Sequence, residues 1–444
     1  MKNLLLICLL LFNPSHLRLT SKSPYDYSSY KYISKDENLS DKTLSSTNSD
    51  ESVLYSTNSV QYVIIQNSNI NKESGDTSNL DNSEKYGVNS AVLIQGGFSF
   101  NIIGGQITSN AKGATGIFST NEGNGIAKDM TITTSGESSC GLASTYEGIL
   151  VANNIKLNTN GINSHAISVN EQGFRIVCQE GSTIITKGER SHLAYLIGEQ
   201  SGSIEIKNSV GTSEKAKIAV ISGTNTFAVN EKSVVKCSAA PNEKESEQCG
   251  IMLYQLKNKY SNACSFQCND ATIEILDTSN YYSSAPMFFV TNTESAITLE
   301  KCQIKYGSNK FIEIKATDKW GNKGTNGGGV VLTLTNQNIE GDFNLDVDST
   351  LIIRLTKNSS IKGKINPTNT AKFVNIFMDE SSSITITGDS YCTSLDNEKA
   401  DGSNLINGTY KWTIGSDKKG SAEGIFKKNL WMIALSLVLN ILIF

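Results

Sequence analysis

The chain has 444 residues, a formal net charge of −4 and a pI near 5.6. This balance offers no basic surface for a phosphate backbone, so composition argues against a nucleic-acid partner. Serine, threonine, asparagine and glycine are abundant, β-branched residues occur throughout, and there are only five prolines. Such a composition is typical of a secreted, all-β, turn-rich protein.

The N-terminal residues 1–21 are predicted to be a signal peptide. Lys2 precedes an apolar run from Leu4 to Phe12, and we expect cleavage between Ser15 and Ser21. The alternative is an uncleaved anchor, although the run is shorter than the roughly 20 residues that span a bilayer.

A unit of about 25 residues repeats along the interior and decides the predicted architecture. Three successive copies can be stacked by eye, at Ala114–Ser139, Cys140–Ser164 and His165–Ser191. Each copy begins with a short run in which apolar and polar residues alternate, followed by a turn that contains glycine. A second apolar run and a run of strand-forming residues complete the copy. Self-similarity at this period predicts a solenoid, in which each repeat buries its apolar face against its neighbours. We predict a right-handed parallel β-helix of about 11–13 coils over residues 51–412.

Residues 22–50 are polar, rich in tyrosine and serine, and not periodic. They are expected to form either a disordered leader or a cap over the first coil, because the end of a solenoid needs a cover.

The C-terminal segment Leu430–Phe444 is apolar and follows a basic pair at 427–428 and small residues around 420. Small residues, a polar spacer and a terminal hydrophobic tail predict a GPI anchor. Within the linker 413–429, Gly420 is the favoured attachment residue and Ser416 the reserve. The alternative is a short transmembrane helix, which would leave the basic pair on the outer side against the positive-inside tendency. Together the two ends predict a protein on the extracellular face of the plasma membrane.

Eight cysteines follow the predicted leader, and an even number in a secreted chain predicts disulfides. Spacing leaves the pairing open; the most local pairs are Cys264/Cys268 and Cys237/Cys249. Sequons also predict N-glycosylation at three positions: Asn38, Asn358 and Asn407.

Two stretches carry a resemblance to known proteins. Ile70–Gly97 and Thr350–Leu395, together with the repeated Thr-x-Gly turns between them, resemble bacterial and archaeal adhesin-like secreted proteins. Those proteins are right-handed parallel β-helices with a pectin-lyase-like fold, and the resemblance covers about residues 45–412. It implies a surface adhesin, whereas the GPI-type tail departs from that group.

Parallel β-helices also include polysaccharide-degrading enzymes, so we searched for their chemistry. The Asp-Asp, Gly-His-Gly and Arg-x-Lys motifs of polygalacturonases do not occur in the sequence. The best carboxylate pair is Asp346 and Asp348, predicted on the outer face of a strand with Leu345 and Val347 inside. This pair is interpreted as a solvated strand face, with a weak Ca²⁺ or glycosidic site as the alternative.

The repeat register predicts a column of metal-ligating residue types. Cys140, His165 and His192 occupy equivalent positions, and Cys249 is expected in the same column two coils later. Thiolate and imidazole suit zinc or copper, but stacks of like residues are also ordinary structural ladders. The structural reading is favoured, and no cofactor is predicted.

Aromatic residues gather in one long coil and its successor. Tyr254, Tyr260, Tyr281 and Tyr282 are candidates for a face that binds sugars or proteins, with Phe288 and Phe289 close by in sequence. The alternative is that these side chains fill the core or face solvent.

Three functions are consistent with these features. The favoured hypothesis is a GPI-anchored, non-enzymatic, adhesin-like protein that displays its solenoid to a glycan or protein partner. The alternatives are a pectin-lyase-like enzyme that acts on polysaccharides at the cell surface, and a structural coat or wall protein.

Overall fold

The computed structural model describes residues 26–57, 59–97, 99–198, 200–238, 247–257 and 263–415. The predicted signal peptide, Tyr260, the attachment residues Ser416 and Gly420, and the tail 430–444 lie outside these residues. Within the described ranges, no helix has the length and apolar character needed to cross a membrane.

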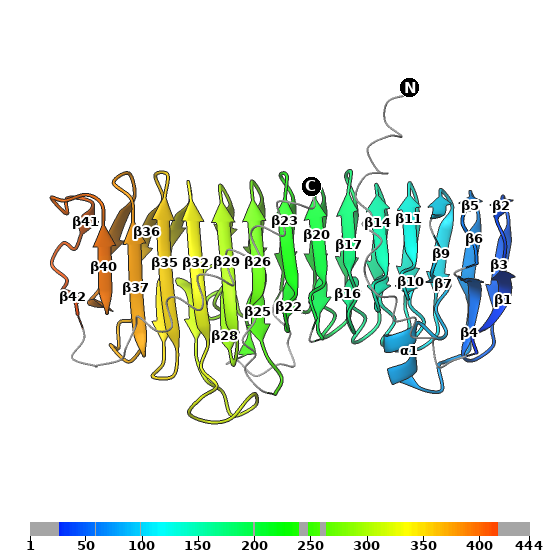
Figure 1. Ribbon diagram of the computed structural model, residues 1–444, viewed down its shortest axis with the longest axis horizontal. Helices are drawn as coiled ribbons and strands as arrows, with labels where there is room; N and C mark the ends of the chain where they lie inside the picture. The colour runs from blue at the N-terminus through cyan, green and yellow to red at the C-terminus, as the bar shows by residue number, and fades with distance from the viewer. Residues whose placement is uncertain are drawn as a thin grey trace, which may run out of the picture.

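The fold is a parallel β-helix, as predicted (Figure 1). The chain winds repeatedly through three sheets, here called A, B and C, and each strand pairs in parallel with its equivalents one coil before and after. Sheet A contains β1 (Ser28–Ile33), β4 (Glu51–Ser56), β7 (Val92–Gln95), β10 (Ile117–Thr120), β13 (Leu142–Ser144), β16 (Ile167–Val169), β19 (Ala194–Leu196), β22 (Ala219–Ile221), β25 (Ile251–Tyr254), β28 (Phe288–Thr291), β31 (Lys310–Ile314) and β34 (Asp342–Leu345).

Sheet B is the longest, with fourteen strands among the described residues. It contains β2 (Glu37–Ser40), β5 (Val63–Gln66), β8 (Phe100–Ile103), β11 (Asn124–Lys128), β14 (Ile149–Asn153), β17 (Arg175–Gln179), β20 (Ser203–Lys207), β23 (Thr226–Asn230), β26 (Cys264–Asn269), β29 (Glu294–Glu300), β32 (Gly329–Thr335), β35 (Thr350–Thr356), β37 (Phe373–Met378) and β40 (Ser394–Asn397).

Sheet C has ten strands, and two smaller sheets complete the C-terminal end. Sheet C contains β3 (Thr43–Ser46), β6 (Asn69–Lys72), β9 (Gln106–Ser109), β12 (Thr131–Thr134), β15 (Lys156–Thr159), β18 (Thr183–Thr186), β21 (Val210–Ser213), β24 (Val234–Cys237), β27 (Thr272–Ile275) and β30 (Gln303–Lys305). The smaller sheets contain β33 (Asn338–Glu340), β36 (Ser360–Gly363), β38 (Ser383–Ile386) and β41 (Leu405–Ile406), and β39 (Ser390–Cys392) with β42 (Trp412–Ile414).

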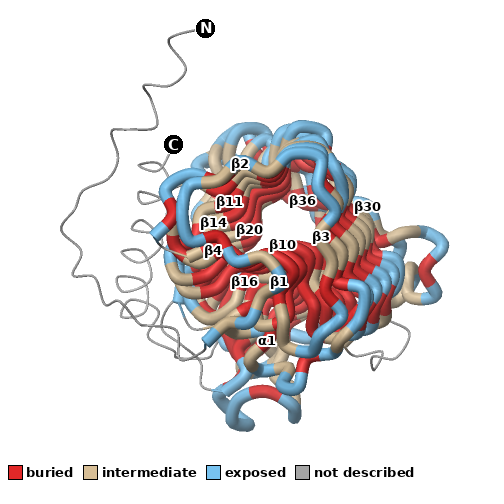
Figure 2. Tube along the Cα trace, turned by 90° about the vertical axis from the view of Figure 1, so that its right-hand side faces the viewer, coloured by how far each residue is buried: buried red, intermediate tan, exposed pale blue. Residues whose placement is uncertain are grey.

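Alternation along each strand explains the core. In sheet C, Ile132, Leu157 and Ile184 occupy the same register position in successive coils and are fully buried. The intervening Thr133 and Asn158 point outward, since successive side chains of a strand face opposite sides. The inward side chains form one continuous core along the axis. Figure 2 shows the buried residues of successive coils along the inside of the solenoid.

Polar ladders bind the corners of successive coils together. Ser139, Ser164 and Ser191 are fully buried at equivalent positions. The backbone N–H of Ser139 donates to Ser164 Oγ over 3.0 Å, and that of Ser164 donates to Ser191 Oγ over 2.9 Å. Each hydroxyl in turn donates to a carbonyl of the preceding coil. Buried corner backbone therefore keeps its hydrogen bonds, as a dry interior requires.

The solenoid begins earlier than the sequence predicted. Within the expected leader or cap at 22–50, β1, β2 and β3 pair with β4, β5 and β6 of the next coil. The first coil therefore starts at Ser28 rather than near Glu51. The fourteen strands of sheet B also extend slightly beyond the expected 11–13 coils.

One disulfide joins successive coils. Cys268 in β26 is bonded to Cys302, which lies 34 residues later in the chain. Neither local pair suggested by spacing is present, because Cys264 and Cys237 are buried free thiols. In a solenoid, residues about one coil apart in sequence are neighbours in space, so closeness in sequence was a poor guide.

A short helix, α1 (Leu80–Tyr86), interrupts the passage from β6 to β7. The side chain of Asn79 accepts from Asn82 N at its start, and Gly87 ends it in the left-handed region at φ 72°. Figure 2 shows α1 on the outside of the coils, on the side of sheet A, and Gly87 at its end lies against Leu93 of β7 and Phe118 of β10.

Candidate functional site

The outer face of sheet A carries an apolar row that runs along much of the rod. One outward position per coil is occupied, in register order, by Tyr55, Leu93, Phe118, Ala143, Ser168, Tyr195, Val220, Met252 and Phe289. Outward apolar side chains are shielded from water only where another segment of the chain packs over them. The coverage along this row therefore shows where a ligand has access.

The helix α1 covers the N-terminal part of the row. Gly87 lies directly against Phe118 and Leu93, and a Cβ there would come within 2.6 Å of the Phe118 ring. Beyond them, the ring of Tyr86 stacks on Tyr146 at 5.6 Å, and Lys85 pairs with Glu171 at 3.5 Å. These contacts fix the C-terminal end of α1 to the corners between sheets A and B.

The connection 315–328 covers the C-terminal part. Trp320 is buried and packs with Met252 and Phe289. The ring of Tyr254 lies 5.3 Å from it, and Lys319 Nζ lies 4.6 Å above the indole while pairing with Glu247 at 3.0 Å. This end of the row is closed by an ordered cluster of side chains.

Between these covers lies what we call the central face: Ala143, Ser168, Tyr195 and Val220, with Cys140, His165 and His192 beside them. Ser168, Tyr195, Cys140 and His165 are partly exposed. The remaining three members are buried. The central face is thus the part of the row where polar, ring-bearing side chains reach solvent.

The predicted column of Cys140, His165 and His192 is confirmed. Leu142, Ile167 and Ala194 are in register, and each column residue precedes its strand by the same two positions. The same register places Lys217 next and Cys249 after it, which agrees with the predicted position of Cys249.

The two imidazoles and a phenol form one stack. The centroids of the His165 and His192 rings are 5.1 Å apart with an interplanar angle of 10°. Tyr195, which was not singled out in the sequence, lies 4.0 Å from the His165 ring at 19°. These distances are those of offset stacking between aromatic rings.

Hydrogen bonds define the chemistry of the imidazoles. The backbone N–H of His192 donates to His165 Nδ1 over 3.1 Å, and the N–H of Lys217 donates to His192 Nδ1 over 3.2 Å. In both neutral rings Nδ1 is the acceptor, so Nε2 carries the proton. Burial lowers the pKa of His165 to about 3, and burial together with His165 and Lys217 lowers that of His192 well below its usual value.

Cys140, His165 and His192 are neutral members of this column at neutral pH, whereas Lys217 is a cation. Burial, with a smaller contribution from Glu84, raises the pKa of the Cys140 thiol to about 12, so it is protonated at neutral pH. Among the described residues there is no group of three or more histidine, cysteine or carboxylate side chains placed to hold a metal. Both Nδ1 atoms are already occupied by backbone donors, so these atoms serve the structural ladder.

The predicted tyrosine face is not one surface. Tyr254 belongs to the cluster around Trp320, whereas Tyr281 and Tyr282 pack against the main core from the connection before β28. Phe288 points into the core and Phe289 into the Trp320 cluster, both fully buried. Alternation along β28 sends adjacent aromatics to opposite sides, which the clustering in sequence concealed.

Asp346 and Asp348 do not share a strand face. β34 ends at Leu345, and the two carboxylates lie in the following turn, where Val347 is 63% exposed instead of buried. Asp346 Oδ1 accepts from Ser349 Oγ over 2.5 Å, and Oδ2 accepts from Ala316 N over 2.7 Å. This carboxylate holds a corner, which is a structural task. The three sequon asparagines, Asn38, Asn358 and Asn407, are exposed.

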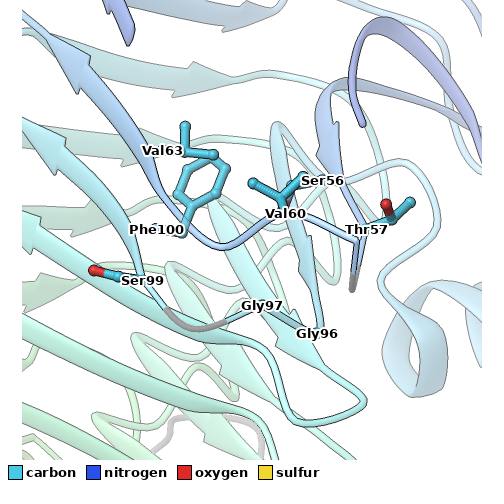
Figure 3. A pocket seen from close by; sticks show the side chains of 8 residues that line it. All are labelled: Ser56, Thr57, Val60, Val63, Gly96, Gly97, Ser99 and Phe100. Atoms are coloured by element: carbon cyan, nitrogen blue, oxygen red, sulfur yellow. The ribbon is translucent and has the colours of Figure 1, made fainter. Parts of the chain in front are cut away.

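A small hollow lies between the second and third coils, at the corner from sheet A to sheet B (Figure 3). Its lining offers only hydroxyl, backbone and apolar groups: Ser56, Thr57, Val60, Val63, Gly96, Gly97, Ser99 and Phe100. No titratable side chain is among these lining residues, and we assign no chemistry to it.

No protein-family model, curated protein or solved structure matches this chain. The central face is therefore the main evidence of function. Of its members, the sequence identified Cys140, His165 and His192 but not Ser168 or Tyr195. Aligning the middle residue of each sheet A strand, rather than the repeat boundary, would have found both.

Proposed function

We propose that the protein is a non-enzymatic binding protein displayed at the cell surface, with an oligosaccharide as its ligand on the central face. The observation that carries this proposal is the stack of His165, His192 and Tyr195 between α1 and the Trp320 cluster, in which His165 and Tyr195 are partly exposed. Planar rings and fixed donors on a rigid scaffold are the features by which proteins hold sugar rings and hydroxyls.

Several features favour binding over catalysis. Cys140 is protonated and the His165 imidazole has a strongly lowered pKa, so neither suits nucleophilic or general-base chemistry at neutral pH. Of the best carboxylate pair of the sequence, Asp346 is engaged in hydrogen bonds that hold a turn. We therefore propose an adhesin-like role, in which surface attachment through the C-terminal GPI signal and display of the solenoid are sufficient.

The test is a glycan array with the soluble ectodomain, followed by titration calorimetry on every positive ligand. Selective binding to saccharides that is lost in His165→Ala/Tyr195→Ala supports the proposal. If the intact ectodomain binds no saccharide, the proposed function is wrong. Release of oligosaccharides from a bound polymer would instead establish an enzyme.

Membrane attachment needs a separate test. Treating cells that express the full chain with phosphatidylinositol-specific phospholipase C should release the protein into the medium. Gly420→Pro should reduce this release if Gly420 is the attachment residue, whereas retention on the cell after lipase treatment would exclude the GPI anchor.

A further inference from the structure

Resting on the proposed function, we infer that the central face selects uncharged saccharides and discriminates against uronates and other anionic sugars. The inference comes from which donors the face presents and which charges surround it. It narrows the ligand from saccharides in general to one chemical class.

The donors on the face are neutral. His165 uses Nδ1 to accept a backbone N–H, so its Nε2–H is the group left for donation to a ligand. His192 is bonded in the same way but is buried, so it supports the stack from behind. Tyr195 adds a phenolic hydroxyl, and its direct neighbour in the adjacent strand, Ser168, adds an aliphatic hydroxyl that also hydrogen-bonds the Cys140 thiol. Neutral N–H and O–H groups match the hydroxyl and ring oxygens of a sugar, whereas carboxylates are bound most strongly by cationic donors.

The cation whose charge acts on the stack is withdrawn from the surface. Lys217 is the cation whose charge acts on His192, and its side chain is only 2% exposed. On the α1 side, Lys85 is paired with Glu171 at 3.5 Å. The central face therefore offers an anionic sugar little compensation for the loss of its hydration.

A carboxylate approaches the same surface from α1. Burial is the main cause of the raised pKa values of Cys140 and Tyr195, and the charge of the exposed Glu84 adds a smaller contribution to both. A second negative charge bound at Tyr195 would be repelled by Glu84. Repulsion of an unwanted ligand is a common basis of specificity, and Glu84 supplies it here.

The experiment compares neutral and acidic oligosaccharides of equal length on the intact ectodomain. Xylo-, cello- and manno-oligosaccharides are titrated beside oligogalacturonates, at low salt and at 0.5 M NaCl. We expect measurable binding of at least one neutral series, with the acidic series at least tenfold weaker at low salt. Equal or tighter binding of the oligogalacturonates overturns the inference while leaving the proposed function intact.

Three variants test whether the central face is responsible for this selectivity. Tyr195→Phe removes one hydroxyl without removing the ring, and we expect about three- to tenfold weaker binding of the neutral ligand. Glu84→Gln should leave the affinity for the neutral oligosaccharides unchanged. It should reduce the difference in affinity between the neutral and acidic series at low salt. Phe174→Ala is the matched control, since Phe174 is an exposed aromatic outside the central face. If Tyr195→Phe and Phe174→Ala bind alike, or Glu84→Gln leaves that difference unchanged, the inference fails.

If no saccharide binds the ectodomain, the proposed function and the inference fail together. Circular dichroism and the melting temperature of each variant establish that a loss of binding is not a loss of fold.

Discussion

The backbone N–H of His192 donates to Nδ1 of His165 across 3.1 Å, which makes one imidazole the acceptor for the next coil. The relationship repeats when Lys217 N donates to His192 Nδ1. Histidine is a common metal ligand, but here each imidazole accepts a backbone hydrogen bond from the next coil. Both imidazoles are structural supports, and the partly exposed His165 also carries a donor proposed for binding.

This dual role predicts different effects for two substitutions of His165. His165→Leu leaves the His192 N–H without its acceptor and should lower the free energy of unfolding by about 1–3 kcal/mol. His165→Asn offers a side-chain oxygen at a similar position and should recover part of that loss. Urea denaturation followed by circular dichroism measures both, and equal stability of the two variants would contradict the ladder.

A second prediction concerns Lys72, a fully buried lysine in the second coil. Its Nζ donates to the carbonyl oxygens of Asn48 and, over 2.8 Å, of Glu51. Burial lowers its pKa to about 8, although Glu51, Asp50 and Asp76 oppose the shift. Between pH 8 and about 10 the unfolded chain binds the proton that the folded chain has released, so stability should rise with pH.

The expected gain is on the order of 1–3 kcal/mol across this range. It is measured as the urea midpoint at pH 7.5, 8.2 and 9.0, where most tyrosines remain protonated in the folded and the unfolded chain. Lys72→Met is the control, because it lacks the titrating group and should show a flatter pH dependence. The same rise in Lys72→Met would assign the effect to another group.

Sequence and structure agree where the physics is local. Alternation of apolar residues predicted the strands, and repeat length predicted which residues share a column, because a coil of nearly constant length brings equivalent positions together. Residues 28–46 were missed because β1, β2 and β3 are short and polar, and their strand character comes from pairing with the second coil.

The functional surface was harder to predict because it depends on which outward side chains are covered by the helix and the long connections. Seven residues of α1 leave almost no periodicity in the sequence, yet this helix decides that Phe118 is hidden while Tyr195 is partly exposed. Similarly, Val347 follows the alternation of β34 but lies beyond its end, so the alternation misplaced it. Strand ends and insertions are set by tertiary packing rather than by local pattern.

A third prediction concerns acid stability at a corner of the C-terminal coils. Asp379 Oδ2 accepts from Lys357 N over 2.7 Å, and Oδ1 accepts from the hydroxyl of Ser381 over 2.8 Å. Burial raises the pKa of Asp379, but hydrogen bonds from Ser382, Lys357 and Ser381 outweigh it, and the net pKa is lowered. Stability from this group is therefore present above about pH 3.8 and lost as pH falls through the folded-state value.

Asp379→Asn should cost about 1 kcal/mol at pH 7, a modest value because the carboxylate is partly exposed to solvent. The cost should shrink towards pH 2.5. Thermal unfolding at the two pH values tests this, with Glu380→Gln at the adjacent exposed position as the control. A cost that is equal at both pH values would indicate a steric effect instead.

The last prediction concerns the bond between Cys268 and Cys302. It closes a loop of 34 residues, and closing a loop of that length restricts the unfolded chain enough to contribute about 3–4 kcal/mol. Cys268→Ser/Cys302→Ser should therefore lower the urea midpoint, and reduction of the wild type should do the same. Mapping of unreduced peptides identifies the pair, and a linked peptide containing Cys264 in place of Cys268 would contradict it.

Because the bond joins β26 to the residue before β30, its loss should expose the coils around β26 and β29 to hydrogen exchange before the N-terminal coils. Uniform exchange along the rod would show instead that the solenoid unfolds as one unit, with the disulfide acting only on the unfolded state.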